Sequence, residues 1–147
     1  MPSRFVHLHT HSHYSLLSAL PKIPELIAAA KANNMNALAL TYNGNLYGAI
    51  EFYKACKKAD IKPIIGVDAY VGARGRKDKE HGIDDARSRL VLLAENLTGY
   101  KNLLKLVTRA NLEGFYYKPR VDHELLREYA EGLIAILPSW NGEIANA

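Results

Sequence analysis

The chain has 147 residues, of which 48% are hydrophobic and 23% are charged, and its formal net charge is +4 at pH 7. This composition excludes a disordered chain, and since no run approaches the roughly 18 uninterrupted apolar residues of a membrane span, it also excludes a membrane partner. Cys56 is the only cysteine, which excludes a disulfide framework and a cysteine-rich zinc module and leads us to expect a cytoplasmic protein.

The first half of the sequence alternates predicted strands and helices. Residues 5–9 are expected to form a short strand, and residues 24–33 an Ala-rich helix. Residues 37–41 are a compact apolar run bounded by turn residues, which is typical of a strand buried on both faces. A second helix is expected over residues 47–59 and a third strand over residues 62–71. This order predicts a parallel sheet.

The next predicted elements follow a long polar stretch. Residues 72–86 are polar and contain glycines, so they are expected to form a loop above the sheet. A fourth strand is predicted over residues 90–94. A helix follows over residues 98–111, with Thr98 as its expected N-cap.

The last predicted elements complete an α/β pattern. Asp122 is expected to cap a helix that runs to Tyr129, and residues 133–137 form a fifth apolar strand. Strands that alternate with helices indicate an α/β fold with right-handed crossovers. Five strands do not close an eight-stranded barrel, so the pattern alone fits both an open doubly wound sheet and part of a (β/α) barrel.

Histidines at alternate positions are the clearest chemical signal. His7, His9, His11 and His13 would share one face of a strand, and His9 and His11 would lie at its carboxyl end. Imidazole is a common ligand of zinc, manganese and iron. The alternative is that these rings only form hydrogen bonds at a strand terminus.

The other strand ends offer few metal ligands. Tyr42 and Asn43 follow the second strand, and a phenol and an amide bind divalent metals poorly. Asp68 near the end of the third strand could bind a metal, or could pair with a basic side chain. Ser139 after the fifth strand supplies only a hydroxyl. The predicted metal site is therefore depleted.

A basic run at residues 74–79 could contact nucleic acid, which the positive net charge would favour. The run contains glycine and no aromatic residue, so it lacks a platform on which single-stranded bases could stack. A solvated loop is the favoured interpretation, and a nucleic-acid-binding module the alternative.

Several blocks together resemble the PHP (polymerase and histidinol phosphatase) domain of bacterial DNA polymerase III alpha subunits. The first is His9-Thr10-His11-Ser12 followed by Tyr14-Ser15-Leu16-Leu17. Agreement continues through residues 37–53, 60–66, 92–100 and 112–120. The resemblance extends over nearly the whole chain, so residues 1–147 are expected to be the N-terminal portion of this domain.

The resemblance implies the N-terminal part of a distorted (β/α)7 barrel with a trinuclear metal site. Members with an intact site carry Asp-His at the positions of Tyr42 and Asn43, Glu at Asp68, His at Arg89 and Cys at Ser139. Only His9 and His11 match outright. The resemblance therefore implies a degenerate site in which His9, His11 and Asp68 are vestigial ligands.

The function implied by this resemblance is a mainly structural role within a replicative DNA polymerase. The expected partners are the remainder of the alpha subunit, a proofreading exonuclease subunit and, through the parent protein, DNA. No cofactor is expected to be required, although one weakly bound zinc or manganese ion could persist. If Arg89 turns inward, we expect it to pair with Asp68 and replace the positive charge of a metal ion. A free-standing metal-dependent PHP phosphoesterase is the alternative.

Overall fold

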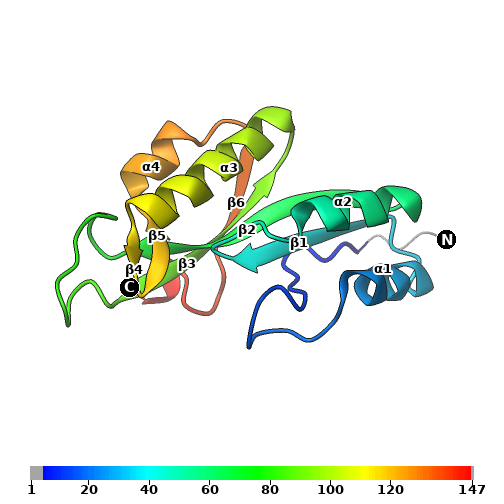
Figure 1. The fold of residues 1–147 in the computed structure, drawn as a ribbon, viewed down its shortest axis with the longest axis horizontal. Coiled ribbons are helices and arrows are strands. Elements are labelled where there is room, and N and C mark those ends of the chain that lie inside the picture. The colour runs from blue at the N-terminus through cyan, green and yellow to red at the C-terminus, as the bar shows by residue number, and fades with distance from the viewer. Residues whose placement is uncertain (1–4, 147) are drawn as a thin grey trace.

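Residues 5–146, which the computed structural model describes, contain one mixed sheet of six strands with helices packed against it (Figure 1). The long second strand lies at the centre of this sheet. Along one edge, this strand pairs with two shorter strands in succession, and both run parallel to it. Its other edge pairs with an antiparallel strand, which in turn pairs with a further antiparallel strand. No helix among these residues is long and apolar enough to cross a membrane.

The first helices and strands agree with the sequence pattern. Helix α1 (Ile23–Ala32) begins where the Lys22 backbone N–H donates to the Glu25 carboxylate at 2.8 Å. Strand β1 (Ala37–Asn43) and helix α2 (Ala49–Lys58) follow, each within a few residues of its predicted bounds. The strand expected over residues 5–9 is not formed, although the His7 and Thr10 carbonyls accept hydrogen bonds from two β1 amides.

The expectation of a fully parallel sheet is wrong after β2 (Lys62–Gly72). This strand is parallel to β1, but β3 (Arg87–Ala94) runs antiparallel to β2. The chain between β2 and β3 contains no helix, so it returns as a long hairpin rather than as a crossover. The start of β3 is thereby brought beside the end of β2.

Of the two predicted helix caps, one differs in the structure and one is confirmed. Helix α3 (Leu97–Leu112) is capped by Asn96 rather than Thr98, because the Asn96 side chain accepts the Gly99 amide at 3.0 Å. The expected cap of α4 (His123–Glu128) is confirmed, with Asp122 accepting from the Leu125 amide at 2.9 Å. The remaining elements are β4 (Phe115–Tyr116), β5 (Lys118–Val121), β6 (Leu133–Ile136) and a short 3-10 helix, η1 (Ile144–Asn146).

The two faces of the sheet differ in character because strand side chains alternate. Leu38, Leu40 and Tyr42 of β1 belong to the core under α1 and α2, and the β2 side chains Val67, Ala69 and Val71 continue this face under α3 and α4. The opposite face carries a small apolar cluster of Ala39, Val91 and Leu93. The polar residues of the candidate site lie on this second face, at the end where β1 terminates.

Candidate metal centre

Strand pairing brings the candidate ligands to one edge of the sheet. Asn43, at the end of β1, pairs with Asp68 of β2. Because β3 is antiparallel, Arg89 near its start pairs with Tyr70, two residues beyond Asp68 on the same face. The hairpin therefore explains why a residue that begins a strand reaches the same site as residues that end strands.

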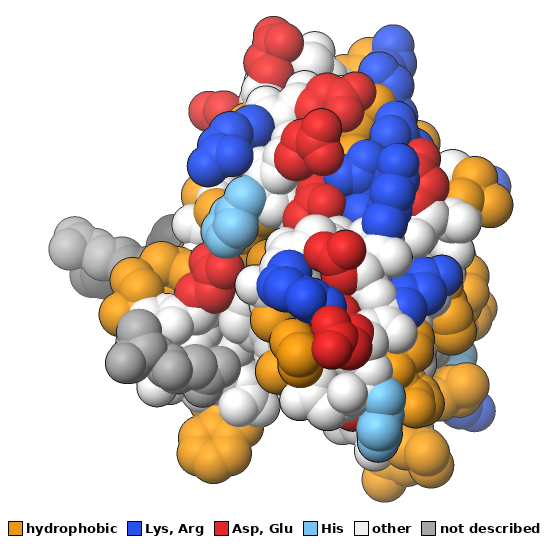
Figure 2. Space-filling model, turned by 90° about the vertical axis from the view of Figure 1, so that its left-hand side faces the viewer, with side chains coloured by type: hydrophobic (Ala, Val, Ile, Leu, Met, Phe, Trp, Pro, Cys, Tyr) orange, Lys and Arg blue, Asp and Glu red, His pale blue; other side chains and the backbone are white. Residues whose placement is uncertain are grey.

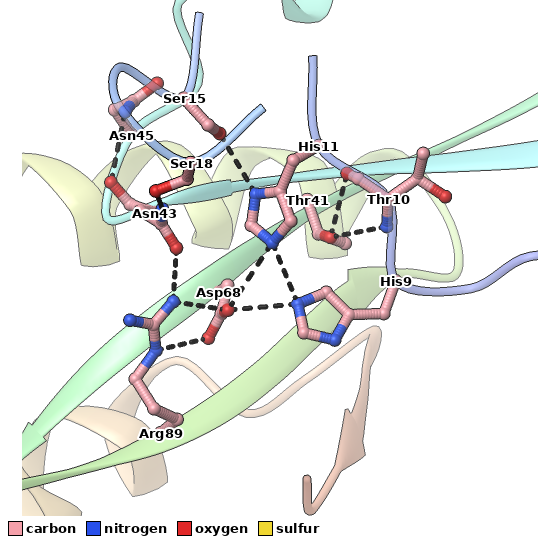
Figure 3. Close-up of polar contacts among 10 residues, drawn as sticks. All are labelled: His9, Thr10, His11, Ser15, Ser18, Thr41, Asn43, Asn45, Asp68 and Arg89. Carbon is pink, nitrogen blue, oxygen red and sulfur yellow. Dashed lines mark hydrogen bonds and ion pairs between the residues drawn. The ribbon is translucent and has the colours of Figure 1, made fainter. Parts of the chain in front are cut away.

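The segment that carries the histidines is held against β1 by Thr41. The Thr41 hydroxyl is fully buried, accepts the Thr10 amide at 3.1 Å and lies 3.2 Å from the Thr10 carbonyl. The Thr41 amide donates to that same carbonyl at 2.8 Å. These contacts fix the backbone between His9 and His11, and both rings consequently point toward Asp68 (Figure 3).

His9, His11 and Asp68 form a compact trio of potential metal ligands. The two histidine Nε2 atoms are 3.1 Å apart, and the Asp68 Oδ2 atom lies 3.0 Å from the first and 3.8 Å from the second. Two nitrogens bound to one zinc ion at about 2.0–2.1 Å would be roughly 3.3 Å apart in tetrahedral geometry. The trio therefore fits one divalent ion. The second ring nitrogen of His11, Nδ1, lies 3.0 Å from the Ser15 hydroxyl. A histidine that binds a metal through one nitrogen usually forms a hydrogen bond of this kind through the other.

Arg89 lies in this site, as the sequence predicted, and it binds the only carboxylate of the trio. Its Nε donates to Asp68 Oδ1 at 2.9 Å, and its Nη2 contacts both Asp68 Oδ2 and Asn43 Oδ1. The guanidinium also lies 4.4 Å from the centroid of the Tyr70 ring. Asp68 is thus held by two parallel hydrogen bonds from a permanent cation.

The electrostatics of the site follow from this pair. Burial of Asp68 opposes its ionisation, but hydrogen bonds from His9 and Arg89 outweigh that effect and lower its pKa. Burial and the neighbouring His9 lower the pKa of His11. An incoming divalent ion would share one carboxylate with a guanidinium whose positive charge repels it. Among residues 5–146, the three grouped ligands are too few for a multinuclear cluster with bridging ligands.

The degenerate positions fall into two groups. Asn43, Arg89 and Ser139 line the same pocket of about 590 Å³ as His9, His11 and Asp68. Tyr42 is buried on the opposite face, where its hydroxyl lies 2.8 Å from that of Ser12. Burial raises the pKa of Tyr42 to about 12 despite this hydrogen bond, so the phenol stays neutral. Of the four degenerate positions, Asn43, Arg89 and Ser139 therefore lie in the pocket and Tyr42 does not.

Sequence reasoning also grouped residues that the structure separates. His7 and His13 do not join the trio, because the chain bends around residues 8–9 and turns at residues 13–14 instead of continuing as a strand. Conversely, Ser15, Ser18 and Thr41 support the site and were not singled out. The Ser18 hydroxyl accepts a hydrogen bond from the Asn43 side-chain amide at 3.3 Å. Ser15 belongs to the first block that resembles the PHP family, whereas the only signal for Ser18 was its position just after the histidines.

The two arginines of the basic run at residues 74–79 are paired with acidic side chains of the same chain. Arg74 donates to the buried Asp84 at 3.0 Å and to Glu80 at 3.0 Å. Arg76 contacts Asp122 at 2.9 Å and Glu113 at 2.9 Å. Acidic and basic side chains accordingly lie side by side over this side of the molecule (Figure 2). Its arginines serve to hold the hairpin loop.

Comparison with known proteins defines the class of this chain. A profile of the PHP domain matches residues 7–147, so the chain belongs to the PHP domain family. Within this family it is similar to the PHP segment of DNA polymerase III subunit alpha: it is 53% identical to the subunit of Borreliella burgdorferi over 90% of this chain, and 48% identical to that of Thermus aquaticus over 96%. The chain spans 12% of the length of each of these relatives.

Two solved structures resemble the fold. An amidohydrolase from Chromobacterium violaceum has a TM-score of 0.51 and 23% identity, with 71% of this chain and 32% of that chain covered. A protein described as a metal-dependent phosphoesterase, from Bifidobacterium adolescentis, has a TM-score of 0.53 and 11% identity, with 75% and 34% covered. These likenesses agree with a partial PHP (β/α) fold.

Proposed function

We propose that this chain serves as the PHP segment of a replicative DNA polymerase III alpha subunit in the bacterial cytoplasm, and that its role there is structural. The observation that carries the proposal is the Arg89–Asp68 pair, which places a permanent cation where the histidines converge. Guanidinium carries no free lone pair and does not deprotonate in proteins, so it cannot coordinate a metal ion. Its charge stabilises Asp68 in the place of a metal ion.

The proposed role assigns the chemistry of DNA synthesis to the remainder of the alpha subunit. The similarity to polymerase subunits over almost the whole of this chain supports that assignment. We further propose that the PHP segment supports assembly of the polymerase and provides a surface for a separate proofreading exonuclease. DNA would be reached through the parent protein.

A free-standing phosphoesterase is the second candidate function. The converging His9, His11 and Asp68 favour it, because a single bound ion could still activate a water molecule. It requires that an ion bind Asp68 against the repulsion of the Arg89 guanidinium, which already holds that carboxylate. The structural proposal predicts instead that no metal-dependent turnover occurs.

A hydrolysis assay separates the two candidates. The purified chain is incubated with bis(p-nitrophenyl) phosphate and with a labelled DNA oligonucleotide, in the presence of Mn²⁺ or Zn²⁺ and with His9→Ala as the control. We expect the chain and its variant to release product at the same background rate. Metal-dependent cleavage that His9→Ala abolishes would establish the phosphoesterase and overturn the structural proposal.

A further inference from the structure

A second pocket lies next to the candidate metal centre. Its volume is about 320 Å³, and it shares Ser18 and Asn43 with the lining of the first pocket. Its walls come from the segment before α1, from the loop after β1 and from the turn between β4 and β5. Three distant parts of the sequence therefore meet around one hollow.

Several aromatic rings line this pocket. Five contribute to it: Tyr14, Tyr47, Tyr70, Phe115 and Tyr117. Tyr47 is 77% exposed, Tyr117 61% and Phe115 52%, although burial of such rings is normally favourable. Exposed aromatic side chains gathered around a hollow are typical of a binding site.

The backbone at Tyr117 adds an independent observation. Tyr117 has φ of 57°, in the left-handed region that bulky side chains rarely occupy. It lies between the paired residues Tyr116 and Lys118 of the β4–β5 hairpin. Such a conformation is unfavourable and occurs preferentially at ligand-binding positions. The hairpin thus keeps an exposed ring at the pocket at a cost in backbone energy.

The charges around the pocket favour an anionic ligand. Lys118 lines it, and among the residues that the structure describes Lys118 forms no ion pair and no lining residue is an aspartate or glutamate. The nearby Glu51 accepts the Tyr14 hydroxyl at 2.8 Å. The pocket therefore combines stacking surfaces with one free ammonium group.

We infer that this pocket binds an unstacked base of a single-stranded nucleic acid. The base stacks on the rings of Tyr47, Phe115 and Tyr117, and a neighbouring phosphate lies near Lys118. Aromatic side chains bind single-stranded bases in this way without sequence preference. The inference goes beyond the proposed structural role and does not depend on it, because stacking requires only the rings of this pocket.

Fluorescence anisotropy of a labelled oligothymidylate of about 12 nucleotides tests the inference on the 147-residue chain, with EDTA present so that the metal centre does not contribute. We expect Tyr47→Ala and Tyr117→Ala each to weaken binding by roughly 5- to 100-fold. Tyr47→Phe should retain affinity, because stacking needs the ring and not the hydroxyl. Tyr53→Ala is the matched control, since Tyr53 is 45% exposed on α2 but lines a different pocket.

Lys118→Gln should also weaken binding and make it less dependent on salt, whereas Lys101→Gln on the exposed side of α3 should not. A duplex of the same length should bind more weakly, because its bases are already stacked. Far-UV circular dichroism confirms that each variant is folded. The inference is overturned if no oligonucleotide binds, if the pocket variants bind as the parent chain does, or if Lys77→Gln with Lys79→Gln abolishes binding while the pocket variants do not.

Discussion

At the scale of single residues, the candidate metal site contains an ion pair between Arg89 and Asp68. His9 and His11 retain the spacing of ligands to one ion, while Arg89 binds the carboxylate that such an ion would need. Asp68 is only 3% exposed, so removing its cationic partner would leave a buried charge uncompensated. The contribution of Arg89 to stability is therefore measurable.

We predict that Arg89→Ala lowers the free energy of unfolding by about 3 kcal/mol, as expected when one partner of a largely buried ion pair is removed. Urea denaturation followed by circular dichroism measures the change. Arg127→Ala is the control, because Arg127 is exposed on α4 and its loss should change stability by less than about 0.5 kcal/mol. Equal effects of the two substitutions would show that the Arg89–Asp68 pair contributes nothing.

The hydrogen bond between the Thr10 amide and the Thr41 hydroxyl leads to a second prediction for single residues. Thr41→Val keeps the shape of the side chain but leaves the Thr10 amide without its 3.1 Å acceptor, which should cost about 1–3 kcal/mol. Thr41→Ser, which keeps the hydroxyl, should cost less. Histidine NMR signals should shift in the valine variant, because the segment that carries His9 and His11 loses an anchor. Unchanged signals and stability would show that β1 does not position the histidines through Thr41.

At the scale of elements, the hairpin loop between β2 and β3 is fixed by arginines. Arg120 is fully buried and donates to the carbonyls of Gly114, Asp84, Arg76 and Asp78. Arg74 holds the same loop through Asp84. Because the loop joins the two strands that carry Asp68 and Arg89, its order maintains the site.

The Arg74–Asp84 contact predicts a dependence of stability on pH. The hydrogen bond from Arg74 is the main cause that lowers the pKa of Asp84 from 3.8 to about 2. A carboxyl group with a lowered pKa stabilises the fold above its unfolded pKa, and this contribution is lost as the pH falls from about 3.8 to 2. The parent chain should therefore be more stable than Arg74→Gln at pH 5, and the difference should shrink toward pH 2. Urea titrations at several pH values measure it, and a difference independent of pH would contradict the assignment.

Local pattern predicted most of the helices and strands but not the direction of the later strands. Apolar runs and caps located β1, α2, β2 and α4 because these signals are local. The antiparallel β3 was missed because residues 72–86, although expected to be a loop without a helix, are long enough for either a hairpin or a crossover. Strands β4 and β5 are short, and β5 contains Pro119 and joins the sheet only by pairing with the distant β2.

The candidate site was predictable to the same extent. The rule that functional side chains follow strand ends identified Asp68, Asn43 and Ser139. It could not separate Asn43 from Tyr42, although adjacent strand residues face opposite sides of a sheet. The aromatic pocket was not foreseen, because its rings come from separate segments that only the tertiary fold brings together.

At the scale of the whole molecule, exposed edges and apolar side chains predict self-association. Strand β6 pairs on one side with β3 and has no partner strand on the other among residues 5–146. Leu16, Leu17 and Leu20 are each more than 80% exposed. Unpaired edges and apolar patches favour association with another chain. Sedimentation velocity should show species larger than the monomer that grow with concentration, and a monodisperse, cooperatively melting monomer would contradict this.

The measurement that tests the central claim most directly is the metal content of the chain after loading with Zn²⁺ and dialysis. If Arg89 occupies the place of a metal ion, the parent chain should retain well below about one equivalent, whereas Arg89→Ala should approach about one, held by His9, His11 and Asp68. Adding His9→Ala to that variant should abolish the gain. The account is contradicted if the parent chain holds two or more tightly bound equivalents, or if Arg89→Ala leaves the metal content unchanged.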